Sequence, residues 1–266
     1  MRIDWKGREA DVREIGSGPA VVLVHGFPLD GAMWSGVARI LSSRFRVLKP
    51  DLPGRGNTEA PASGVAEYAD FIATVVEAAE GPVGLAGFSF GGYIALELLS
   101  RGDTNLRALA LVDTRASADD DAGRARRDET IESVRANGVA PLVDSMPAKL
   151  LAPEFLTRGD LRERVQRIIS RQRPETVEAD LAAMRDRPDR IALLPGLSIP
   201  TLVVVGDRDA LTPSADSEAM VAAIPGARLV TIPGAGHLTP MERPKAVSEA
   251  LGEFFSATLG EPSPPD

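Results

Sequence analysis

The sequence predicts an α/β fold with a mostly parallel sheet flanked by helices and an inserted helical cap. Short apolar runs alternate with helical segments, which favours a parallel sheet covered on both faces. Between about residues 114 and 196 the strand pattern is absent, and the sequence is polar, rich in arginine and typical of helices. The strand pattern resumes after this segment. A chain of 266 residues is long enough for one large domain with such an insertion.

The elements before the insertion follow from local patterns. Residues 8–15 predict a short edge-type strand that ends at a Gly-Ser-Gly-Pro turn, and residues 20–24 form an apolar run typical of a buried strand. Apolar side chains between Val65 and Ala79 recur at helical spacing, which indicates a helix with one buried face. Further strands are expected at residues 45–48, 83–86 and 106–112, and a further helix at residues 89–100.

The sheet resumes after the insertion. Strands are predicted at residues 201–205 and 228–232, and a final helix with proline near its start at residues 244–257. We expect a core domain from residues 1–113 and 197–259, the helical cap from residues 114–196, and a disordered Pro-rich tail from residues 260–266.

The predicted cap is rich in arginine. We interpret its arginines as solvated helix faces paired with nearby acids, the alternative being an anion-attracting rim over the active site. We expect more of its apolar side chains to pack on the core than to touch substrate. The arginines are Arg124, Arg126, Arg127, Arg135, Arg158, Arg162, Arg164, Arg167, Arg171 and Arg173, and the apolar side chains are Met146, Leu150, Leu151, Phe155 and Leu156.

Composition restricts the classes of function. A net charge of −8 and a pI near 5.0 argue against binding to nucleic acid or to an anionic membrane, since both need a basic surface. The absence of cysteine excludes disulfides, thiolate catalysis and zinc–thiolate sites. The N-terminus has no apolar signal segment and no stretch approaches about 18 uninterrupted apolar residues, so we expect a cytoplasmic location.

A Gly-x-Ser-x-Gly pentapeptide spans residues 87–91, where an apolar run gives way to a helical one. Such a strand-to-helix turn strains the serine backbone and lifts its hydroxyl clear of the sheet. Side chains at Gly87 or Gly91 would collide as the helix folds back over the strand end. Ser89 is therefore the candidate nucleophile, and it needs a base to take its proton.

The chain has two histidines, His25 and His237, so a Ser–His mechanism must use one of them. His237 follows the last predicted strand in a glycine-rich loop, which is where a site at the carboxyl ends of the strands would carry its base. His25 directly follows the strand at residues 20–24, and we expect it to shape that loop by hydrogen bonds.

An imidazole base needs a carboxylate that fixes its tautomer and stabilises the imidazolium. Asp209 lies a few residues beyond the strand at residues 201–205 and is the favoured acid. Asp113, directly after the strand at residues 106–112, is the alternative.

Attack on a carbonyl creates an oxyanion that needs N–H donors. The N–H of Phe90 follows the nucleophile and is the first expected donor. The N–H of Phe27 is the second, because the next residue, Pro28, has none. We also expect both aromatic rings to lie beside the scissile group.

With these residues in place, the chain resembles the α/β-hydrolase superfamily from about Val21 to Phe255. The order Ser89, Asp209, His237 is that superfamily's order of nucleophile, acid and base. The pieces at residues 25–30, 87–93, 113–116 and 234–242 are similar to small bacterial serine carboxylesterases. Related patterns occur in cofactor-free perhydrolases (serine haloperoxidases), enol-lactonases and acyl-carrier methyl esterases, and Pro28 resembles a proline of the perhydrolases.

The expected function is hydrolysis of small, short-chain acyl or aryl esters through an acyl-enzyme, with no metal or organic cofactor. Perhydrolysis and lactone hydrolysis are the enzymatic alternatives. A hydrolase-like ligand sensor that binds a partner protein is the alternative of another class. The expected partner is a small-molecule ester, and the sequence predicts no oligomeric state.

Overall fold

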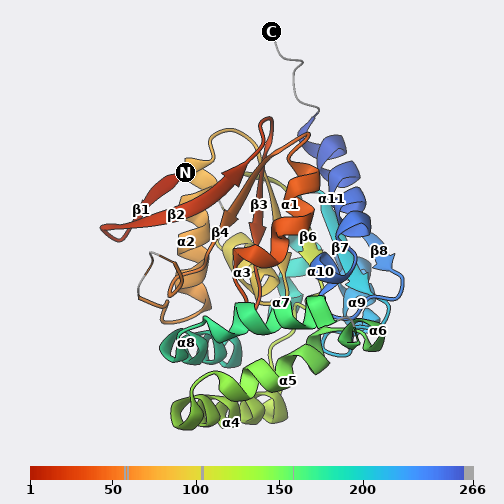
Figure 1. Ribbon diagram of the computed structural model, residues 1–266. Helices are drawn as coiled ribbons and strands as arrows, with labels where there is room; N and C mark the ends of the chain where they lie inside the picture. The colour runs from red at the N-terminus through yellow and green to blue at the C-terminus, as the bar shows by residue number, and fades with distance from the viewer. Residues whose placement is uncertain (57, 59, 103–104, 158, 261–266) are drawn as a thin grey trace.

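The computed structural model describes residues 1–56, 58, 60–102, 105–157 and 159–260. The strands in these residues are β1 (Arg2–Trp5), β2 (Arg8–Ile15), β3 (Ala20–Val24), β4 (Arg46–Pro50), β5 (Val83–Phe88), β6 (Leu106–Val112), β7 (Thr201–Gly206) and β8 (Arg228–Ile232). They form one sheet in the order β1-β2-β4-β3-β5-β6-β7-β8 (Figure 1). β2 runs antiparallel to both of its neighbours, β1 and β4, whereas β3 to β8 run parallel to one another. The predicted α/β fold with a mostly parallel sheet is confirmed.

The prediction of an edge strand at residues 8–15 is wrong in one respect. These residues form β2, but β1 pairs with it on the outer side and takes the edge position. Lys6 and Gly7, with φ of 55° and 72°, make the tight turn between the two strands. The ring of Trp5 lies 5.5 Å from that of Phe71, so β1 is held by packing that four residues of sequence do not reveal.

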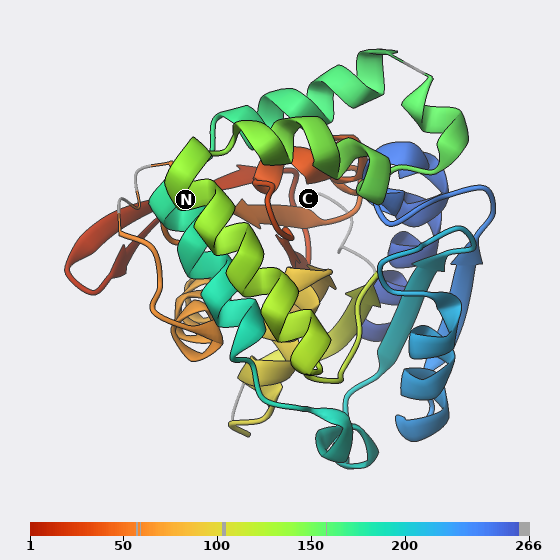
Figure 2. The ribbon, with the colours of Figure 1, turned by 90° about the horizontal axis from the view of Figure 1, so that it is seen from below.

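Helices cover both faces of the sheet. They are α1 (Ser35–Leu41), α2 (Val65–Ala78), α3 (Phe90–Leu99), α9 (Ser214–Ala223), α10 (Thr239–Glu242) and α11 (Pro244–Leu259). Seen along the strands, α1 and α11 lie on one side of the sheet and α2 and α3 on the other (Figure 2). The buried face predicted for the helix after Val65 is confirmed, because the side chains predicted for that face are at most 7 % exposed: Val65, Tyr68, Phe71, Ile72, Val75, Val76 and Ala79.

Between β6 and β7 the chain forms α4 (Asp121–Asn137), α5 (Ala140–Leu150), α6 (Pro153–Leu156), α7 (Gly159–Ser170) and α8 (Pro174–Arg185). These inserted helices lie across the end of the sheet where the parallel strands finish (Figures 1 and 2). Ion pairs join this segment to the core elements, and two of them link it to the loops after β3 and β4. Arg171 bonds Asp30 at 2.8 and 3.0 Å, and Asp180 pairs with Arg55 in a buried contact.

The predictions for Arg158 and for residues 261–266 lie outside the described residues. In the part of the chain that the structure describes, no helix is both long and apolar enough to cross a membrane.

Candidate active site

Ser89 occupies a sharp turn between β5 and α3. Its φ of 50° lies in the left-handed region, which residues other than glycine adopt at a cost in strain. A Cβ at Gly87 would lie 2.4 Å from the carbonyl oxygen of Gly91, and a Cβ at Gly91 would lie 2.5 Å from that of Val24. The steric reason predicted for both glycines therefore holds, and the turn carries the serine at the carboxyl end of β5.

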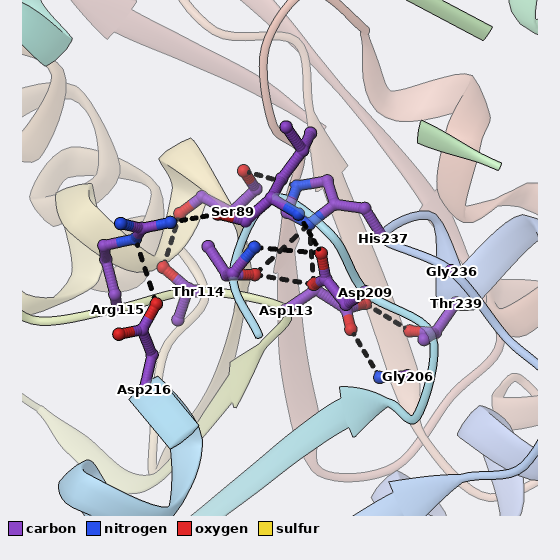
Figure 3. Close-up of polar contacts among 12 residues, drawn as sticks. Ser89, Asp113, Thr114, Arg115, Gly206, Asp209, Asp216, Gly236, His237 and Thr239 are labelled. Carbon is purple, nitrogen blue, oxygen red and sulfur yellow. Dashed lines mark hydrogen bonds and ion pairs between the residues drawn. The ribbon is translucent and has the colours of Figure 1, made fainter. Parts of the chain in front are cut away.

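His237 lies between Ser89 and Asp209 (Figure 3). Its Nε2 is 2.9 Å from Ser89 Oγ, and its Nδ1 is 2.8 Å from Asp209 Oδ2. The imidazole is buried, with 3 % of the residue exposed. The structure thus brings together three side chains from the loops that follow β5, β7 and β8, as the sequence predicts.

The carboxylate of Asp209 is held by its own loop. Oδ1 accepts the N–H groups of Leu211 and Thr212 at 2.8 and 2.9 Å, and Oδ2 accepts the Thr212 hydroxyl at 2.6 Å. Burial alone would raise the pKa of Asp209, but the nearby His237 and the hydrogen bonds from His237 and Thr212 lower that pKa below its usual value. Asp209 is therefore ionised at neutral pH, and its orientation is fixed by backbone donors.

Asp113, the alternative acid, makes different contacts. Its Oδ1 accepts the N–H of Gly206 at 2.9 Å, and its Oδ2 accepts the hydroxyl of Thr239. Complete burial, together with the nearby charge of Asp209, raises the pKa of Asp113 well above its usual value. Asp113 thus connects the end of β7, just before the Asp209 loop, to Thr239, just after His237.

The second histidine lies apart from this arrangement. His25 is fully buried, its Nε2 accepts the N–H of Leu52 at 3.0 Å, and its Nδ1 donates to the carbonyl of Gly26 at 3.1 Å. Burial and the neighbouring Arg55 lower the pKa of His25 to about 4, so its ring is neutral. The structure agrees with the predicted loop-shaping contacts of His25.

The backbone N–H groups of Phe27 and Phe90, the predicted oxyanion donors, have no hydrogen-bond partner among the described residues. The side chain of Phe27 lines the same cavity as Ser89. The expectation for the Phe90 ring is wrong. This ring is fully buried, with its centroid 5.2 Å from that of Tyr68 and 6.4 Å from that of Tyr93, because the first turn of α3 directs it towards α2.

A cavity of about 250 Å³ opens beside Ser89 and His237. The inserted helices supply much of its wall. Of the five apolar side chains singled out in this segment, Met146 and Leu150 line the cavity, Leu151 and Phe155 are buried without lining it, and Leu156 is partly buried against the hydrophobic core. The apolar residues of the wall are Phe27, Tyr93, Leu142, Met146, Leu150, Leu181, Met184 and Leu211.

Two contacts around His237 escaped the sequence analysis. The Thr212 hydroxyl lies 3.2 Å from His237 Nδ1. The buried carboxylate of Glu242 accepts the N–H of Gly236 at 2.5 Å and that of Ala152 at 3.0 Å. Burial raises the pKa of Glu242 to about 7. Glu242 thus joins the loop of His237 to the start of α6, a contact that no local pattern could have revealed.

Within the ranges described, no group of three or more histidine, cysteine, aspartate or glutamate side chains could hold a metal ion.

Comparisons with known proteins show which family the chain resembles. Residues 21–250 match the model of a family described as "Alpha/beta hydrolase family". The chain is 30 % identical to a pimeloyl-[acyl-carrier protein] methyl ester esterase of Aeromonas hydrophila, over 91 % of this chain and 98 % of the relative.

Solved structures are similar over almost the whole chain. A thermophilic esterase from Thermogutta terrifontis, solved with malate bound, superposes with a TM-score of 0.91 at 36 % identity, covering 97 % of this chain and 98 % of its own. A bromoperoxidase from Bacillus anthracis superposes with a TM-score of 0.82 at 25 % identity, covering 94 % of this chain and 96 % of its own.

Proposed function

The chain belongs to the alpha/beta hydrolase family, and on that premise we propose that it is a serine carboxylic ester hydrolase that works through an acyl-enzyme. One observation carries the proposal. Ser89 Oγ, His237 and Asp209 form a continuous chain of hydrogen bonds of 2.9 and 2.8 Å at the wall of a cavity. This is the arrangement in which an imidazole can activate a hydroxyl.

In the proposed reaction, His237 Nε2 takes the proton of Ser89 as Oγ attacks the ester carbonyl. Asp209, ionised and bonded to Nδ1, stabilises the imidazolium that forms. The N–H groups of Phe27 and Phe90 hold the oxyanion, since both are free of other partners among the described residues. Each such donor is worth roughly 2.7–4 kcal/mol in a transition state.

The imidazolium then donates its proton to the departing alcohol, which leaves Ser89 acylated. Water, activated by His237 in the same way, attacks the acyl carbonyl and releases the acid and the free hydroxyl. Every proton moves between Ser89, His237, water and the substrate. The proposed reaction therefore requires no metal or organic cofactor.

The cavity supports a small substrate. A volume of about 250 Å³, with the eight apolar residues named above in its wall, suits a short acyl chain or a small aryl group. We propose that residues 114–196 act as a cap that completes this cavity over a core formed by residues 1–113 and 197–259. The named esterase activities of the Aeromonas hydrophila and Thermogutta terrifontis relatives support ester hydrolysis without identifying the ester.

The test is the variant S89A, assayed with p-nitrophenyl acetate and by labelling with a fluorophosphonate. We expect turnover to fall by about 10³-fold or more, and the mass shift of the phosphonylated protein to disappear. The matched control is S43A, which removes an exposed hydroxyl whose one hydrogen bond among the described residues goes to the carbonyl of Ile40. Activity of S89A within tenfold of the parent would contradict the proposal.

A further inference from the structure

The wall of the cavity carries an excess of positive charge, although the whole chain has a net charge of −8. Of the described residues that line it, four carry a positive charge and one, Asp119, carries a negative charge. The four cations are Arg115, Arg126, Arg127 and Lys149. Most come from the inserted helices, with Arg126 and Arg127 on α4 and Lys149 on α5.

The single carboxylate does not neutralise this wall. Asp119 lies 3.0 Å from Arg127 and 2.9 Å from Arg187, so two guanidinium groups share it. Arg115 lies 3.3 Å from Asp216 (Figure 3). The side chains of Arg126 and Lys149 are exposed, and within the described ranges neither forms an ion pair. Two positive charges at the cavity therefore lack a protein partner.

The cavity combines this charge with an apolar stretch. Leu142, Met146 and Leu150 of α5 line it together with Lys149, and Ser89 and His237 line the same space. A molecule bound at Ser89 in this cavity would thus have both apolar side chains and unpaired cations around it. Low-dielectric walls strengthen the field of such cations and raise the local concentration of anions.

We propose that the site prefers esters that carry a second, anionic group, a carboxylate, separated from the ester carbonyl by a short apolar spacer. Arg126 and Lys149 would bind that carboxylate and determine specificity, while the reaction at Ser89 stays unchanged. This inference rests on the proposed ester hydrolysis and names the substrate class of the same site. The charge can lie on the acyl or on the alcohol side of the ester, and the test separates these two cases.

Two matched pairs of substrates test the proposal. For the acyl side, p-nitrophenyl hydrogen glutarate is compared with p-nitrophenyl pentanoate, in which a methyl group replaces the carboxylate. For the alcohol side, 4-acetoxybenzoate is compared with 4-acetoxybenzamide. In each pair the ratio of kcat/KM for the charged ester to that for the neutral ester, corrected for the uncatalysed rates, measures the preference.

We expect this ratio to be about tenfold or more for at least one pair at low salt, and to fall as salt rises because exposed charges are screened. The double variant R126Q/K149Q should bring the ratio close to one, mainly through KM for the charged ester. The control is R124Q, on the same helix but outside the cavity wall. It should keep the parent's ratio. Because Arg126 and Lys149 are exposed, their replacement should leave the thermal unfolding temperature unchanged.

The outcomes separate this inference from the proposed function. Absence of turnover for all four esters would contradict ester hydrolysis itself. Turnover of the neutral esters with ratios near one for both pairs would leave ester hydrolysis standing and overturn the anionic preference. A ratio that persists in R126Q/K149Q, or that falls equally in R124Q, would also overturn the role of these two side chains.

Discussion

Exchange of the two buried aspartates for asparagine tests the geometry around His237 most directly. In D209N, the amide oxygen is expected at the position of Oδ1, where the N–H groups of Leu211 and Thr212 point. The amide nitrogen then takes the position of Oδ2, 2.8 Å from His237 Nδ1. An amide N–H can only donate there, so Nδ1 must accept, and the imidazole proton moves to Nε2.

This tautomer cannot act as a base, because Nε2 now presents its proton to Ser89 Oγ at 2.9 Å. Loss of one hydrogen bond to a charged group costs about 1.5–3 kcal/mol, which is about 10–150-fold in rate. The wrong tautomer adds to this. In serine proteases the corresponding change lowers kcat by about 10⁴-fold, or about 5.4 kcal/mol, and we expect a loss of that size here.

D113N should behave differently. The pKa of Asp113 is raised well above its usual value by burial and the nearby Asp209, which favours the uncharged carboxyl, and an amide resembles that form in shape and charge. The amide oxygen can still accept the Gly206 N–H, and the amide nitrogen can donate to the Thr239 hydroxyl. We expect D113N to keep kcat within about tenfold of the parent.

The assay is kcat for p-nitrophenyl acetate at pH 7.5 for the parent and both variants. Circular dichroism and thermal unfolding will verify that each variant is folded. A larger loss in D113N than in D209N, or a loss in D209N below about tenfold, would refute the assignment of Asp209 as the acid.

Two further predictions concern stability. Burial raises the pKa of Glu242 to about 7 in the folded protein, whereas the pKa of a glutamate in the unfolded chain is about 4.3. Between these two pH values the folded state binds more protons than the unfolded state. The free energy of unfolding should therefore fall as the pH rises from about 4.5 to 7, by up to about 3 kcal/mol. E242Q should flatten this part of a urea-denaturation pH profile, and an unchanged slope would show that Glu242 is not its origin. G91A should lower the free energy of unfolding by about 1–3 kcal/mol or more, because the new Cβ would lie 2.5 Å from the carbonyl oxygen of Val24. G196A, with open space at the same position, is the control, and equal stability of both variants in urea would disprove the close approach.

Much of this molecule followed from local pattern. The parallel strands, the helix after Val65 and the turn at Ser89 each follow from the residues of one segment, whose hydrophobic period or glycine spacing is set by backbone geometry. The order of Ser89, Asp209 and His237 along the chain could also be read from the sequence. With two histidines in the chain, and only His237 in a loop after the last strand, the choice of base was narrow.

Other features depended on which distant segments meet. β1 was missed because its four residues are held by β2 and by Phe71 rather than by their own pattern. In the sequence, Asp209 and Asp113 both follow a strand and could not be told apart by that position. The structure distinguishes them by their hydrogen-bond partners, because Asp209 contacts His237 whereas Asp113 contacts Gly206 and Thr239.

The sequence by itself therefore determined the fold class, the candidate nucleophile and the candidate base, and it restricted the acid to Asp209 or Asp113, because short-range periodicity and turn chemistry carry that information. Only the tertiary structure decided the opposite pKa shifts of Asp113 and Asp209, the contact of Glu242 with Gly236 and Ala152, and the cationic wall around Arg126 and Lys149. A pKa and a cavity wall are set by burial and by neighbours distant along the chain, which come together only when the chain folds.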